Sequence, residues 1–109
     1  MVFVSGQVGV GAEGNALEEF EAQARRVFDS IKALLESAGA SMEDVVKVSA
    51  FLVDRKHFPT YNRVRSEYFK SRFPASTTVI VKRLVAPEYL VEVEAFAVID
   101  RTYSSPVPR

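Results

Sequence analysis

Apolar residues recur along this chain with two periods, and each period predicts a different kind of element. Alternating apolar positions predict strands over residues 2–8, 45–53, 77–84 and 89–100. Spacings of three and four predict one helix that begins at Asn15 and ends at Gly39, and a second over residues 58–70. Glu18 follows Asn15 at the distance found in a capping box. The predicted order of elements is therefore β-α-β-α-β-β.

This order predicts an α+β fold with a mixed sheet and two helices on one of its faces. The last two strands follow each other closely, and we expect them to form a hairpin. Several strands are apolar on both sides, so the face without helices also needs cover, and a second copy of the chain is the expected cover. We expect a single domain over residues 1–100 and a loose C-terminal tail over residues 101–109, which holds two prolines.

Composition narrows the possible classes of function. The chain has 109 residues, of which 48% are hydrophobic, enough for one compact domain. Basic and acidic residues number 14 each, so neither nucleic acid nor an anionic membrane is expected as a partner. There is no cysteine, and hence no disulfide framework and no thiolate nucleophile. The chain has no leader-like or membrane-length apolar run, so we expect a cytoplasmic protein.

The strongest candidate chemistry is a pair of glutamates in the last predicted strand. Side chains of a strand alternate between its faces, so Glu92 and Glu94 share one face with Leu90, Phe96 and Val98. Carboxylates on an apolar face are costly unless they are exposed, paired or used for chemistry. Their spacing is too wide for two carboxylates that share a proton, so only one of them would act in proton transfer.

Two other features are weaker candidates. Gly9, Gly11 and Gly14 match the spacing of a dinucleotide-binding loop. The next strand ends too far along the chain to supply the ribose-binding acid, so a glycine-rich turn is the preferred interpretation. His57 is the only histidine, and a metal site would need carboxylates for its other ligands, so no metal is expected.

Seven segments, taken in order, resemble one family. They are FVSGQ (3–7), AQA (22–24), VVKV (45–48), FPTYN (58–62), EYF (67–69), FPA (73–75) and VEVEA (91–95). Together they are similar to the Rid family (RidA/YjgF-like) of reactive-intermediate deaminases, over nearly the whole chain. The resemblance implies a chorismate-mutase-like fold, a homotrimer whose sheets form a central barrel, and small-molecule pockets between the subunits.

The resemblance also implies an activity, the hydrolysis of an enamine or imine to a keto acid and ammonia, with no cofactor. It assigns the handling of water to Glu92 and places Ser5 and Gly6 in the lining of the pocket. Asn62 and Thr78 fall at further pocket positions. Members of the family also carry a segment with a pocket tyrosine before the first strand, so we expect either that this contribution is missing here or that the start of the sequence is misassigned.

The sequence departs from the family pattern at Ser76. Family members have an arginine there that binds the carboxylate of the substrate, and a serine cannot replace the two parallel bonds of a guanidinium. We therefore expect a substrate other than a simple 2-imino acid, with Glu94 as a structural residue. The alternative is a non-catalytic trimer that binds or senses a metabolite. An endoribonuclease or translation inhibitor ranks third, because a neutral chain does not favour RNA.

Overall fold

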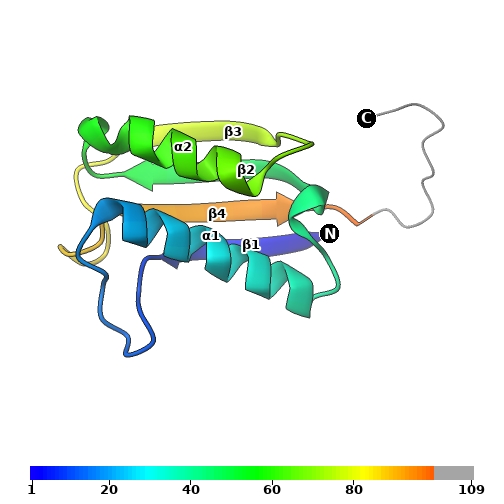
Figure 1. The fold of residues 1–109 in the computed structure, drawn as a ribbon, viewed down its shortest axis with the longest axis horizontal. Coiled ribbons are helices and arrows are strands. Elements are labelled where there is room, and N and C mark those ends of the chain that lie inside the picture. The colour runs from blue at the N-terminus through cyan, green and yellow to red at the C-terminus, as the bar shows by residue number, and fades with distance from the viewer. Residues whose placement is uncertain (100–109) are drawn as a thin grey trace.

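The computed structural model describes residues 1–99, which form two α-helices and four strands (Figure 1). The strands are β1 (Val2–Val8), β2 (Val45–Leu52), β3 (Ala75–Ile80) and β4 (Val91–Ala97). The α-helices are α1 (Phe20–Ser37) and α2 (Phe58–Tyr68), and short 3-10 helices η1 (Met42–Asp44) and η2 (Arg55–His57) precede β2 and α2. The predicted order of elements is confirmed, and the predicted tail at residues 101–109 lies outside the described residues.

The four strands form one mixed sheet in the order β1-β4-β2-β3. Strand β4 is antiparallel to both of its neighbours, whereas β2 and β3 are parallel. The expected hairpin between the last two strands is therefore wrong, because β2 lies between them. The physical reason is the crossover through α2, which returns the chain to the starting end of the sheet and adds β3 parallel to β2. The segment from β3 to β4 then crosses the end of β2, where the Val81 N–H donates to the Leu52 carbonyl at 2.8 Å.

Both helices cover the same face of the sheet, α1 over β1 and β4, and α2 over β2 and β3 (Figure 1). The core lies between the helices and the sheet. The apolar stripe of α1 that faces it runs through Phe20, Ala24, Val27, Ile31 and Leu35, whereas Leu34 is exposed. Its fully buried side chains include Ala24, Val27, Phe28, Ile31, Leu35, Tyr61, Val64, Val48, Leu52, Val91, Val93 and Ala97. Neither helix is long and apolar enough to cross a membrane. The opposite face of the sheet has no cover from residues 1–99.

Helix α1 begins later than predicted. Its first residue is Phe20, and the N-cap, Glu19, makes no side-chain capping bond. Asn15 instead belongs to the preceding turn, where the Gly11 N–H donates to the Asn15 carbonyl at 2.9 Å. The predicted glycine-rich turn is thus confirmed, and it takes up the residue that was expected to cap the helix.

A buried glutamine ties this turn to the loop before β4. Gln23 is fully buried, and its Nε2 donates to the carbonyls of Leu17 at 2.6 Å and Glu88 at 2.9 Å. Its Oε1 accepts a hydrogen bond from the Leu90 N–H at 2.9 Å. The side chain is therefore well satisfied, as a buried amide needs to be. These bonds hold the start of β4, and with it Glu92, against α1.

Candidate functional site

Glu92 and Glu94 lie on the open face of the sheet, by which we mean the face opposite α1 and α2. The residues that alternate with them in β4 are buried under the helices, which confirms the predicted sharing of one face. In the sheet, Glu92 lies opposite Val8 of β1 and Phe51 of β2. Within residues 1–99, neither carboxylate forms an ion pair.

The Glu92 carboxylate lies against a residue that has no side chain. Strand β1 changes its register to β4 between Val4 and Gln7, and Gly6 lies in this irregular segment. A Cβ atom added at Gly6 would lie 1.8 Å from Glu92 Oε2 and 2.8 Å from Glu92 Cδ. The carboxylate therefore fills the space that any other side chain at this position would need. Ser5 is exposed in the same segment, and we call Ser5, Gly6 and Glu92 the open-face group.

The rest of the open face carries exposed apolar side chains. The Phe3 and Phe96 rings lie 4.7 Å apart between centroids, and these residues are 67% and 41% exposed. Val79, on the edge strand β3, is 40% exposed. Neighbouring exposed apolar side chains of this kind are typical of a surface that contacts another molecule.

Asn62, Ser76 and Thr78 lie on the other side of the sheet, and we call them the groove group. In the parallel ladder Ser76 lies opposite Val48 and Thr78 opposite Ala50. Both of these β2 residues are buried under the helices. Strand neighbours that lie opposite each other share a face, so the side chains of Ser76 and Thr78 face α2, which carries Asn62.

An arginine that the sequence analysis missed joins the groove group. Arg65 of α2 donates from Nη1 to Ser76 Oγ at 2.6 Å and from Nη2 to Asn62 Oδ1 at 2.5 Å. The sequence held one usable signal, because Arg65 follows Asn62 by three residues and shares its face of the helix. A guanidinium thus lies against the serine that occupies the position of the family arginine.

The six predicted site residues therefore form two separate groups rather than one pocket. The open-face group and the groove group lie on opposite sides of the sheet. The structure brings together the members of each group, but one chain does not bring the two groups into contact.

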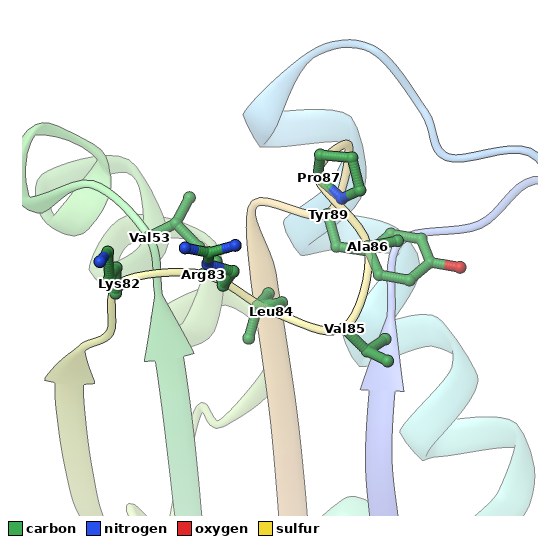
Figure 2. A pocket seen from close by; sticks show the side chains of 8 residues that line it. All are labelled: Val53, Lys82, Arg83, Leu84, Val85, Ala86, Pro87 and Tyr89. Atoms are coloured by element: carbon green, nitrogen blue, oxygen red, sulfur yellow. The ribbon is translucent and has the colours of Figure 1, made fainter.

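A further hollow of about 500 Å³ lies at the end of the sheet where β2 and β3 finish (Figure 2). Its walls are residues 82–87 of the loop from β3 to β4, together with Val53 and Tyr89. Figure 2 shows Lys82 shortly after the end of β3, and Arg83 and Val53 both line the hollow. None of the predicted site residues contributes to these walls.

The architecture defines a class of small α+β proteins with two helices on one face of a four-stranded mixed sheet. The family model described as endoribonuclease L-PSP matches residues 1–99. The chain belongs to this family, which is the YjgF/RidA family, and the resemblance found in the sequence is confirmed.

Individual relatives agree with this assignment. The chain is 43% identical to a RutC family protein of Pyrococcus abyssi, over 88% of this chain and 76% of that protein. It is 39% identical to a 2-iminobutanoate/2-iminopropanoate deaminase of Dermatophagoides farinae, over 91% of this chain and 78% of that protein. It is also similar to the solved structure of RidA from an Antarctic Psychrobacter, with a TM-score of 0.84 and 38% identity over 89% of this chain and 79% of that one.

Proposed function

We propose that the protein hydrolyses an enamine or imine of a small metabolite to a carbonyl compound and ammonia. The observation that carries this proposal is the position of Glu92, whose carboxylate lies on the open face against the bare backbone of Gly6. Ser5 is exposed in the same segment of β1. The relatives named 2-iminobutanoate/2-iminopropanoate deaminase support the same class of reaction.

The reaction needs one group that moves a proton. Water adds to the carbon of the C=N bond and forms a carbinolamine, whose C–N bond then breaks to leave the carbonyl product and ammonia. A carboxylate that accepts a proton from the water and returns it to the nitrogen serves both steps. Glu92 takes this role in our proposal. For an enamine, the same group first carries a proton from the nitrogen to the carbon, which converts the enamine to the imine.

We further propose that the protein is a homotrimer with each pocket between two copies. The exposed apolar side chains of the open face support a contact between copies. The position of the two residue groups supports it as well, because only a neighbouring copy could bring a groove group against an open-face group. The substrate would then lie between Glu92 of one copy and the groove group of the next.

The test compares Glu92→Gln with the matched control Glu94→Gln. Imines are generated from several amino acids by an amino-acid oxidase, and the release of ammonia is followed. We expect Glu92→Gln to lower the rate at least about 100-fold, because a general acid–base group contributes this much, while Glu94→Gln stays near wild type. Light scattering should show trimers for both variants.

Two results would contradict the proposal. A wild-type rate in Glu92→Gln would exclude the assigned role of this carboxylate. A wild-type protein that accelerates the hydrolysis of none of the imines would favour the alternative, a trimer that binds a metabolite without converting it.

Hydrolysis of imines is preferred over cleavage of RNA for an electrostatic reason. Binding of RNA rests largely on neutralisation of phosphates by basic side chains, and this chain has equal numbers of basic and acidic residues. We expect no cleavage when the protein is incubated with single-stranded RNA under conditions in which it releases ammonia from imines.

A further inference from the structure

Arg65 differs from Arg25 and Arg63, two other arginines of the helices. Arg25 bonds Glu67 at 2.8 Å and Glu21 at 3.0 Å, and Arg63 bonds Glu21 at 2.7 Å. Within residues 1–99, Arg65 has no carboxylate partner. Its side-chain partners are neutral, the Ser76 hydroxyl and the Asn62 amide oxygen. Arg65 therefore carries a charge for which the described chain supplies no counter-charge.

The guanidinium of Arg65 keeps donors for a ligand. It has five N–H groups, and the two bonds to Ser76 and Asn62 use two of them. These partners hold the group in one orientation along β3, while the side chain remains partly exposed. A guanidinium that is oriented in advance loses less entropy when it binds a planar carboxylate.

A second observation is a buried hydroxyl beside the Arg65 and Thr78 side chains. Tyr61 is fully buried, and its hydroxyl has no hydrogen-bond partner of good geometry within the described chain. Burial raises the pKa of Tyr61 to about 12, and the nearby Arg65 and Thr78 side chains act in the opposite direction. A buried hydroxyl whose partners are poorly aligned is costly. A polar ligand between Arg65 and Thr78 could supply a well-aligned bond.

A hollow of about 340 Å³ adjoins the groove group at Thr78. Its walls are Arg55 of η2, Phe58 and Pro59 of α2, and Thr78 and Ile80 of β3. Thr78 thus belongs both to this hollow and to the polar end of the groove near Tyr61. The site combines the cations Arg65 and Arg55 with a short apolar wall, which suits a small molecule that has an acid group at one end and an apolar chain at the other.

We propose that Arg65 binds the carboxylate of a small monocarboxylic acid with a short apolar chain, in place of an arginine at position 76. The inference deepens the proposed function, because this acid group would belong to the same imine or enamine that Glu92 hydrolyses. It makes Arg65 the residue that selects acids over neutral compounds. An α2 side chain reaches the position that the Ser76 side chain is too short to serve.

The test measures binding by isothermal titration calorimetry on the assembled protein, with 2-oxobutanoate as the acid probe and 2-butanone as its neutral counterpart. We expect wild type to prefer the acid, and Arg65→Gln to weaken acid binding at least about tenfold, because charge-assisted hydrogen bonds are lost. Arg63→Gln is the matched control, since it removes the same charge two residues away and should leave binding unchanged. The double variant Arg65→Gln/Ser76→Arg should bind the acid again, because it moves the guanidinium to β3.

Circular dichroism establishes that the variants fold, and Arg65→Lys, which keeps the charge but not the planar fork, should bind with intermediate affinity. The inference is overturned if wild type does not bind 2-oxobutanoate, if Arg65→Gln binds it as wild type does, or if Arg63→Gln loses as much affinity. Turnover separates this inference from the proposed function. If Arg65→Gln loses acid binding in a protein that releases no ammonia, the acid site stands and the hydrolase does not. If Glu92→Gln loses turnover while Arg65→Gln keeps both binding and turnover, the hydrolase stands and the acid site does not.

Discussion

Substitution of Gly6 by alanine tests the position of the Glu92 carboxylate without touching the carboxylate itself. The new Cβ would lie 1.8 Å from Glu92 Oε2, whereas carbon and oxygen atoms in contact lie about 3.3 Å apart. The carboxylate must therefore move by about 1.5 Å, the difference between these two distances. A misplacement of about 1 Å can cost about 100-fold in rate, so we expect ammonia release to fall about that much.

The same substitution should leave the stability of the fold nearly unchanged. Among residues 1–99 the glycines with positive φ are Gly14 and Gly39, so the backbone at Gly6 accepts an alanine. Replacing glycine at such a position gains about 0.4–1 kcal/mol through the unfolded chain. That gain offsets the displacement of one flexible side-chain end. Urea unfolding should place the free energy of unfolding within about 1 kcal/mol of wild type.

A double-mutant cycle tests whether Gly6→Ala acts through the Glu92 carboxylate. If Gly6→Ala acts only by displacing the carboxylate, it should cause no further loss of rate in a Glu92→Gln background. An additive loss would show that Gly6 acts independently of Glu92. A Gly6→Ala protein with wild-type turnover would show that the close approach of these residues has no part in the reaction.

Three further predictions concern the fold and its assembly. Phe3→Lys places a charge in the open face and should dissociate the proposed trimer, and light scattering that still finds trimers would argue against this face as the contact. Gln23→Leu leaves three buried backbone groups without partners and should lower the free energy of unfolding by about 3 kcal/mol or more in urea; a loss under about 1 kcal/mol would mean that water replaces the bonds. Burial holds the pKa of His57 below its ordinary value of 6.5, so the unfolded chain binds more protons and stability falls as the pH drops through this range. His57→Phe, which keeps the stack on Phe20, should reduce that fall between about pH 7 and 5, and an unchanged slope would exclude His57 as its source.

The elements and their faces could be predicted from the sequence because each depends on a local period. Alternation in β4 placed Glu92 and Glu94 on one face, and the structure agrees. The pairing of strands does not follow from local periods. The last two strands were expected to pair, but β2 lies between them, since the crossover through α2 decides the neighbour. The prediction that Asn15 starts the first helix was wrong for a similar reason. The Asn15 carbonyl accepts a hydrogen bond from Gly11 within a turn, and helical periodicity does not describe such a turn.

The candidate site was predictable only as a list of residues. The family resemblance named both groups, but it did not reveal that they lie on opposite sides of the sheet, because that depends on the register of β3 against β2. Arg65 was missed because its importance comes from contact with Ser76, eleven residues further along the chain. The spacing of residues within one element does not predict a contact between a helix and the strand that follows it.

The separation of the open-face group from the groove group has a genetic consequence. If each pocket takes one group from each of two copies, a chain with Glu92→Gln and a chain with Arg65→Gln damage different halves of it. Assembled together at random in equal amounts, they would leave about one pocket in four with both halves intact. Two alleles damaged in different groups would therefore complement each other in one cell, whereas two alleles damaged in the same group would not.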